Sequence, residues 1–332
     1  MRAKTDKNIV AKFDCTSQYL SDVSPQDKPW DVHKANNDKV SGMYQELEDG
    51  KRVLRLNKCS DFLEFTFGET EENKNKFKLN SARFCHVRTC PVCQWRRSLT
   101  WRARLHKAMP KIFEGRQNYQ LIFLTLTIKN CEVNELRKTI SLLNKSWKKL
   151  INYKAFPGKG WIKSVEVTRP SDTHAHPHLH CIVLVSSSYF SGKLIQSHAA
   201  WVKHWRKALG VNYDPSVRVN KVKLKGKPRE VVTKKLGRPP THVEALSYAL
   251  VEVFKYSVKE SDLTASATWL QAITKQLHHT RAIALGGLFK EHMSEQEPED
   301  LLNLEEQDLE EIKEEAKILF GWDKNDKRYR SL

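Results

Sequence analysis

Three histidines alternate along one short segment of the sequence, HPHLHCIVLV (176–185). The apolar and β-branched residues that follow them are typical of a buried strand. Because side chains two residues apart in a strand point the same way, His176, His178 and His180 should share one sheet face. Imidazole is the commonest neutral metal ligand, and two such rings suit a divalent ion such as Mn or Zn, or Mg when a carboxylate assists. The segment therefore predicts a divalent-metal site.

A carboxylate on the preceding strand-like segment, WIKSVEVTR (161–169), extends this set. Glu166 lies between two valines, and a lone carboxylate in such a place is costly to bury unless it is paired or bound to a metal. His178 and His180 form a His-hydrophobic-His pair and are predicted as ligands, with Glu166 as the third. His176 could be a further ligand or could contact a phosphate of the substrate. Solvated or otherwise satisfied histidines are the alternative.

A glutamate and a tyrosine lie four residues apart in the segment VEVFKYSVKESD. Helical periodicity over 243–259 would place Glu252 and Tyr256 on one face, with Lys259 near it. A tyrosine hydroxyl has a pKa of about 10, so it needs a metal-polarised phosphodiester or a nearby ammonium to attack at neutral pH. A carboxylate one turn away could activate water for a second cleavage. Taken alone, such a pair usually means an ordinary surface contact, and Tyr248 is the alternative nucleophile.

A cluster of cysteines indicates a second metal site. Cys85, Cys90 and Cys93 lie in FCHVRTCPVCQWRR, where the CPVC step spaces two thiols as in a zinc knuckle. Structural zinc takes four ligands, and Cys59 is predicted as the fourth, with His86 as the alternative. The alternatives to zinc are unrelated buried thiols or a redox dithiol. Disulfides are not expected, because the N-terminal sequence lacks an export signal.

Arginines and tryptophans interleave directly after this knuckle, in WRRSLTWRARLHKAMPKIF (95–113), which has the character of a basic helix. Aromatic side chains can stack on bases and arginines can contact phosphates. The tryptophans could equally pack into a core, so the arginines are the predicted DNA contacts: Arg96, Arg97, Arg102 and Arg104.

The charge of the 332-residue chain favours the same class of partner. The formal net charge is +18, although the stretch 291–315 alone carries −11, so the remaining residues carry +29. Each Lys or Arg that meets a phosphate releases counterions, and such a balance therefore favours a polyanion. No apolar run approaches the roughly 20 residues that span a bilayer. We expect a cytoplasmic protein that does not enter a membrane.

The secondary-structure pattern mixes helices and strands. A polar, weakly periodic N-terminal arm and a basic loop or hairpin over 221–240 separate or flank the regular elements. The expected strands are 121–128, 161–169 and 176–185. The expected helices are 133–152, 197–209 with Ser197 as N-cap, 243–259, and an acidic amphipathic helix over 298–320. The apolar seam of the last helix could dock on its own domain or pair with a second copy.

Taken in order, these motifs resemble those of HUH-type rolling-circle plasmid replication initiators, in the branch with one tyrosine and an assisting glutamate. The segments CSDFLEF, FCHVRTCPVCQWRRS and RAIALGGLFK are also similar to that family, so the resemblance covers roughly residues 50–290. The four motifs that carry it are FLTLT (123–127), SVEVT (164–168), HPHLHCIVLV (176–185) and EVFKYSVKESD (252–262).

The resemblance implies an α+β fold, in which an HUH endonuclease domain has a central antiparallel sheet and flanking helices. The histidines would lie on a central strand and the tyrosine on a packed helix, with an N-terminal zinc-binding region in addition. The resemblance places a zinc- and DNA-binding region at 51–115 and a nicking domain at 116–290. Outside it, the sequence pattern adds a variable arm (1–50) and an acidic helical tail (291–332), which is not part of the family's motif set.

The resemblance also implies a mechanism. Mg or Mn, held by His178 and His180 with Glu166 or His176, would lie at the scissile phosphate of plasmid origin DNA, in a hairpin or a single strand. Tyr256 would attack, leaving a 5′-phosphotyrosine and a free 3′-OH that primes a polymerase. Lys259 would assist Tyr256, and Glu252 would activate water to end the reaction.

A host helicase and polymerase are the implied protein partners, and the initiator could be a homo-oligomer. The alternatives are a single-strand HUH transposase and a non-catalytic, zinc-containing DNA-binding regulator. The regulator would leave the histidine strand and the Glu–Tyr pair unexplained.

Overall fold

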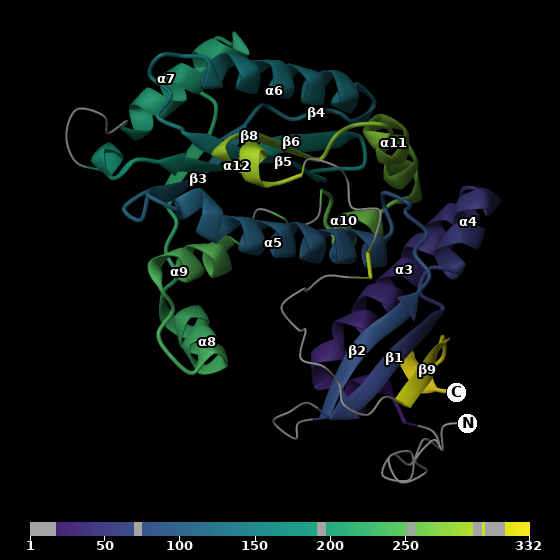
Figure 1. Ribbon diagram of the computed structural model, residues 1–332. Coiled ribbons are helices and arrows are strands. Elements are labelled where there is room, and N and C mark those ends of the chain that lie inside the picture. The colour runs from purple at the N-terminus through teal and green to yellow at the C-terminus, as the bar shows by residue number, and fades with distance from the viewer. Residues whose placement is uncertain are drawn as a thin grey trace. The chain divides into compact units, whose positions relative to one another are not determined.

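The structure is a computed structural model. It describes residues 18–69, 75–190, 197–250, 254, 257–294, 301–302 and 316–332. The chain divides into two compact units, of which the first comprises Met1–Arg97 with Glu299–Leu332 and the second Ser98–Pro298. Helix α5 (Pro91–Phe113) begins in the first unit and ends in the second (Figure 1).

The first unit is built from short helices and one antiparallel sheet, whose strand order is β10-β9-β1-β2. Its elements, besides the start of α5, are α2 (Leu20–Val23), the 3-10 helix η1 (Pro25–Asp27), α3 (Pro29–Glu46), α4 (Gly50–Asn57), β1 (Phe62–Glu69), β2 (Asn75–Ala82), β9 (Ala316–Asp323) and β10 (Arg328–Ser331).

Part of the predicted N-terminal arm is folded, which corrects the expectation for residues 1–50. The 18-residue helix α3 buries Trp30, Val40 and Tyr44. It also buries Lys34 and Asn37, whose side chains donate to backbone carbonyls. Because buried polar residues such as these interrupt the apolar periodicity, the sequence pattern does not predict this helix.

The C-terminal residues 316–332 form strands, so the helix predicted over 298–320 and the helical tail over 291–332 are wrong there. Strand β9 pairs with β1, a segment far away in the sequence. Ile318 and Phe320 are buried whereas Leu319 is 41% exposed, which is the two-residue alternation of a strand. Residues 303–315 lie outside the described residues. The acidic residues before β9 favoured a helix over 298–320. The pairing of β9 with β1 outweighs this local preference from residue 316 on.

The second unit contains a six-stranded sheet whose main path is β7-β3-β6-β5-β8, with β4 paired to β6. Its elements, after the start of α5, are β3 (Gln120–Thr127), β4 (Cys131–Glu132), η2 (Val133–Glu135), α6 (Leu136–Ile151), β5 (Gly160–Thr168), β6 (His174–Val185), η3 (Ser187–Phe190), α7 (His198–Leu209), β7 (Val217–Lys221), α8 (Gly226–Leu236), α9 (His242–Ala249), α10 (Glu260–Leu263), α11 (Ala267–Leu277), β8 (Ile283–Gly287) and α12 (Leu288–His292).

All named pairings in this sheet are antiparallel, and β6 is its central strand. The α+β class and the antiparallel sheet expected from the sequence are thus confirmed. Helices α6 and α7 lie on one side of the sheet and α5 on the other (Figure 1). Ile182 and Leu184 of β6 belong to the core cluster that includes Met109 and Ile112 of α5. His178 and His180 have the same parity along β6, so they share this face.

Two further expectations for the second unit change. The basic segment 221–240 contains helix α8, because Pro228 lies in its first turn, where a missing N–H costs little, and Gly237 ends it with φ 66°. Helix α9 ends at Ala249, whereas the sequence predicted a helix to 259. Val258 instead forms an isolated parallel bridge with Val167. Ser197 caps α7 as predicted, accepting from the Ala200 amide at 3.2 Å.

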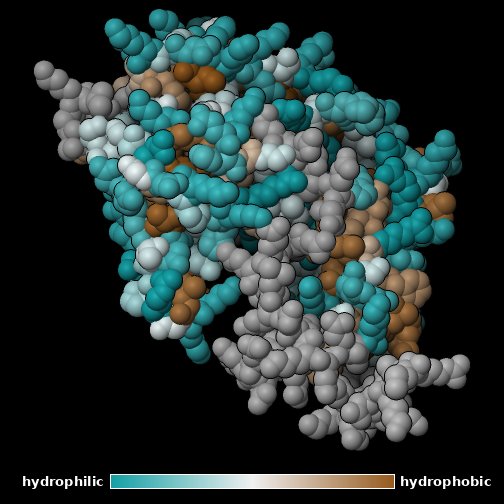
Figure 2. Space-filling view, viewed as in Figure 1, coloured by the Kyte–Doolittle hydropathy of each residue, from teal (hydrophilic) through white to brown (hydrophobic). Residues whose placement is uncertain are grey.

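The surface in Figure 2 is mostly hydrophilic over the described residues, in keeping with a sequence that is 29% charged. Among the helices that the structure describes, none is both long enough and apolar enough to cross a bilayer.

Candidate functional site

Glu166, His178 and His180 converge at one end of the second unit's sheet. Each offers a ligand atom within 4.8 Å of the others. His180 Nε2 lies 2.6 Å from Glu166 Oε2, and His178 Nε2 lies 3.4 Å from the same oxygen. The two Nε2 atoms are 3.1 Å apart. The register causes this convergence, because Glu166 of β5 is paired directly with His178 of β6. Three donors aimed at one point fit a divalent cation.

The other ring nitrogens of the two histidines have partners of their own. His178 Nδ1 lies 3.3 Å from the His176 carbonyl oxygen, which accepts a hydrogen bond when Nδ1 carries a proton. His180 Nδ1 lies 3.3 Å from the Thr125 hydroxyl, and the Phe123 ring stacks on His180 at a centroid distance of 5.3 Å. Such contacts orient metal-binding imidazoles.

Glu166 is held in its charged form. Burial raises the pKa of its carboxyl group, but hydrogen bonds from His178 and His180 and the charges of these rings lower it more. The net result is a pKa well below the usual range. The carboxylate is therefore available as a metal ligand throughout the neutral range.

His176 lies beside this group and not in it. Its Nδ1 is 2.7 Å from Asn130 Oδ1, and its ring centroid is 5.4 Å from that of His178. Burial and the nearby His178 lower the pKa of His176, so the neutral ring is favoured. A neutral imidazole next to the three donors can contact a substrate without itself binding the metal.

Glu252 and Tyr256 lie outside the described residues, whereas Ser257 and Val258, which follow Tyr256, are described. The Ser257 carbonyl accepts a hydrogen bond from the Val167 amide at 2.8 Å, and Val258 forms a bridge with Val167. Val167 is the residue after Glu166. The chain immediately after Tyr256 is therefore bound to the strand that carries one of the predicted ligands.

Two other residues near this segment are described. Phe254 is 2% exposed and its ring is parallel to that of Trp101, with the centroids 6.2 Å apart. Lys259 is exposed and precedes α10, where its carbonyl accepts from the amides of Asp262 and Leu263. Lys259 is thus not on a helix continuous with α9. Phe254 and Val258 anchor the segment by burial, a function that the sequence motif did not reveal.

The four predicted zinc ligands, Cys59, Cys85, Cys90 and Cys93, come together in the first unit. Three of their Sγ–Sγ distances are 3.6, 3.7 and 3.6 Å. Four thiolates 2.3 Å from a tetrahedral zinc ion would be about 3.8 Å apart, so the cluster fits this ion. Hydrogen bonds from the other three thiols lower the pKa of Cys93, while burial raises that of Cys90. The alternative ligand His86 is exposed and is not in the group.

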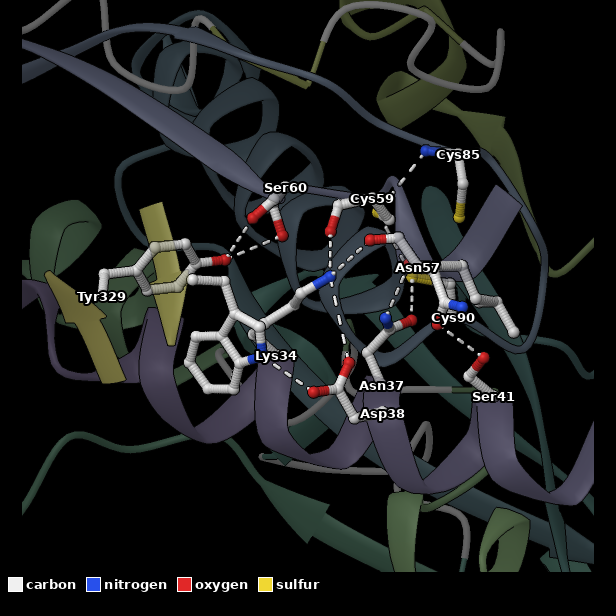
Figure 3. A network of polar contacts seen from close by, with 12 residues as sticks. Lys34, Asn37, Asp38, Ser41, Asn57, Cys59, Ser60, Cys85, Cys90 and Tyr329 are labelled. Atoms are coloured by element: carbon white, nitrogen blue, oxygen red, sulfur yellow. Dashed lines mark hydrogen bonds and ion pairs between the residues drawn. The ribbon is translucent and has the colours of Figure 1, made fainter. Parts of the chain in front are cut away.

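Helix α3 supports the cysteines through buried polar side chains (Figure 3). Lys34 is 1% exposed, and its ammonium donates to the Cys59 carbonyl at 2.7 Å and the Asn57 carbonyl at 3.1 Å. Asn37 accepts from the Cys90 thiol at 3.2 Å and donates to the Leu56 carbonyl at 2.9 Å.

The last strand supports the same cluster. The buried Tyr329 hydroxyl lies 2.5 Å from the Ser60 carbonyl, next in sequence to Cys59 (Figure 3). Lys34, Asn37 and Tyr329 are not predicted from the sequence, because no motif links residues so distant in the chain.

The predicted DNA-binding arginines fall into two groups. Arg96 is 5% exposed, and its guanidinium donates to the carbonyls of Leu301 and Leu302 at 2.8 Å each. A buried group of this kind cannot reach a phosphate, so the prediction is wrong for Arg96. Arg97, Arg102 and Arg104 are partly exposed, and their predicted contact with DNA remains a proposal.

Known proteins resemble this chain over most of its length. A protein family described as Replication protein matches residues 76–330. A protein named Protein rep from Lactiplantibacillus plantarum is 30% identical over 320 residues, covering 91% of this chain and 95% of that protein. A namesake from Lentilactobacillus hilgardii is 27% identical over 333 residues, covering 95% and 99%. No solved structure matches the chain. The chain therefore belongs to the replication protein family and is a Rep initiator of plasmid replication.

Proposed function

We propose that this chain starts rolling-circle replication by nicking one strand of plasmid origin DNA, with Tyr256 as the nucleophile. The convergence of Glu166, His178 and His180 on one point carries this proposal. Two imidazoles and one carboxylate are donors that suit Mn, or Mg with carboxylate help. Such an ion, when bound, would polarise the phosphodiester and stabilise the charge that develops on it.

The chain's own residues would supply the nucleophile of the nicking reaction and hold it in place. The Tyr256 phenol oxygen would bond to phosphorus while the bond to the 3′ oxygen breaks. The phenol loses its proton and the leaving 3′ oxygen gains one, so a 5′-phosphotyrosine and a 3′-OH result. The hydrogen bond from Val167 to Ser257 supports Tyr256, because it fixes the next residue beside the strand of Glu166.

Three further residues have proposed functions around this step. Glu252 would activate the water that ends the reaction after one round. Lys259, which is exposed, would attract the DNA strand or assist the phenol. His176, neutral and beside the ligand group, would contact the scissile phosphate.

A structural zinc ion in the Cys59–Cys85–Cys90–Cys93 cluster is the second part of the proposal. Four donors that are all buried are typical of a closed structural site. The zinc ion would hold the start of α5, and with it Arg97, Arg102 and Arg104, in position to contact origin DNA. Replication would then require a host helicase and polymerase.

The alternatives fit the observations less well. A single-strand transposase would share the cleavage chemistry, but the relatives carry replication names. A non-catalytic zinc-containing regulator would need no convergent His–His–Glu group.

The test is to incubate the protein with supercoiled plasmid carrying its candidate origin and Mg or Mn. We expect nicked plasmid and a covalent protein–DNA adduct on denaturing gels. Tyr256→Phe should abolish both, while Tyr248→Phe should leave both intact. Adduct formation by the Tyr256→Phe protein would disprove the proposed nucleophile, and its loss only in Tyr248→Phe would assign the reaction to Tyr248.

A further inference from the structure

The histidine-bearing face of the sheet continues onto the edge strand β7. Thr125 of β3 is paired with His180 on one side and with Arg218 of β7 on the other. Both registers run without a break across these residues. Because directly paired residues in antiparallel strands point to the same side, Arg218 shares a face and a transverse row with His180.

Arg218 is exposed, and in the part of the chain that the structure describes its side chain has neither an ion pair nor a hydrogen bond. Between it and His180 on this row lies only the short side chain of Thr125. The backbones of β6 and β7 are two strand spacings apart, which is about 10 Å. The planar guanidinium is suited to bidentate binding of a phosphate.

In the opposite direction, the same row carries no exposed cation among the residues that the structure describes. Beyond His180 it continues to Ser164 of β5 and Ile283 of β8, and both side chains are buried and uncharged. The Ser257–Val258 segment also binds to β5 on that side. Within this transverse row, the cation lies over β7, whereas the side chains over β5 and β8 are buried and uncharged. Lys259, which is exposed, follows the Ser257–Val258 segment on the β5 side but is not part of the row.

We propose that Arg218 binds a backbone phosphate of a single DNA strand that crosses β3 and β7 after it leaves the Glu166–His178–His180 group. This inference rests on the proposed function and adds the direction in which the strand runs across the sheet. The phosphate would be at most about three nucleotides from the one at the histidines, given a rise of about 3.4 Å per nucleotide in a stacked strand.

The test measures binding, which needs no cleavage. A fluorescein-labelled oligothymidine would be titrated by anisotropy at several KCl concentrations, without added Mg or Mn, with the full chain. We expect Arg218→Gln to weaken binding about tenfold, and to reduce the slope of log affinity against log salt by about 0.7, the value for one phosphate contact on a single strand. Arg218→Lys should retain most of the slope.

Lys221→Gln is the matched control. Lys221 is exposed on the same edge strand, but it is three residues along and therefore on the other face, with its ammonium 4.5 Å from the centre of the Phe190 ring. The Lys221→Gln variant should leave the slope of log affinity against log salt unchanged. Equal losses in Arg218→Gln and Lys221→Gln would overturn the proposal, as would no loss in Arg218→Gln or no binding by the wild type.

This binding test and the adduct assay can fail independently. If the wild-type protein forms no covalent adduct with origin DNA while Arg218→Gln alone weakens binding, the proposed nicking fails but the phosphate contact stands. If adducts form normally and Arg218→Gln binds as the wild type does, only the phosphate contact fails.

Discussion

The two groups of side chains that could each hold a metal ion differ in burial and in the number of donors. The cysteine group of the first unit has four sulfur ligands that are at most 9% exposed. The histidine group of the second unit has three ligands, and Glu166 and His180 are only partly buried. Four ligands complete a tetrahedral shell, whereas three leave a position for a further ligand.

The two groups also differ in which parts of the chain supply their supporting contacts. The cysteines are held by buried side chains from α3 and β10, which are distant in sequence. The histidines are held by residues on adjacent strands, namely Thr125 and Phe123 of β3. The first arrangement joins chain segments together, while the second orients ligands on a sheet that is already formed. We therefore expect that removing a cysteine of the first group unfolds the first unit. Removing a histidine of the second group should abolish nicking and leave the fold intact.

The largest effect should follow removal of a histidine ligand. His180→Ala should lower the rate of plasmid nicking by roughly a thousandfold or more, because Lewis-acid stabilisation contributes several kcal/mol. His279→Ala, an exposed histidine elsewhere in the second unit, is the control. Thermal unfolding of both variants should match the wild type. Nicking by His180→Ala at the wild-type rate would show that the histidine group does not serve catalysis.

Removal of a cysteine ligand should act on the fold. Cys90→Ser should release zinc and destabilise the first unit by several kcal/mol, because the binding free energy of a structural metal is folding free energy. Zinc content by atomic absorption and unfolding followed by circular dichroism would measure this. Cys131→Ser, a partly buried cysteine outside the cluster, should keep its zinc. Full zinc content in Cys90→Ser would contradict the assignment.

An intermediate effect is expected at the hydroxyl that contacts His180. Thr125→Ala should weaken Mn binding or nicking by about tenfold, because partners of metal-bound imidazoles typically contribute this much. Thr125→Ser keeps the hydroxyl and should restore most of the loss. The apparent Mn affinity from nicking rates against Mn concentration would distinguish the variants. Equal behaviour of the alanine and serine variants would show that the hydroxyl does not orient the ring.

An effect on stability alone should come from the buried tyrosine of β10. Tyr329→Phe leaves the ring in place but removes the hydrogen bonds to Ser60, so it should cost about 1–3 kcal/mol of stability. Urea unfolding would report the change. Tyr213→Phe, in the second unit, should be milder, because its hydroxyl bonds an exposed backbone amide. Nicking at saturating metal should survive in both variants.

Local patterns were sufficient to predict the members of both groups that could hold a metal ion. Alternating histidines predict a shared face in any strand, and the CPVC step predicts a knuckle, because both depend on residues a few positions apart. The strands β3, β5 and β6 and the helix α6 were predicted for the same reason. The helix expected to continue to residue 259 was not found, because pairing of Val258 with Val167 competes with helical hydrogen bonding.

What the sequence by itself determined is thus the chemistry of each ligand and the periodicity of each strong element. The tertiary structure decided which strands are neighbours, that Glu166 faces His178, that Arg218 lies in the row of His180, and that Arg96 is buried. It also decided that Lys34 and Tyr329 support Cys59 and Ser60. These facts depend on contacts between segments tens to hundreds of residues apart, and only the folded chain brings such segments together.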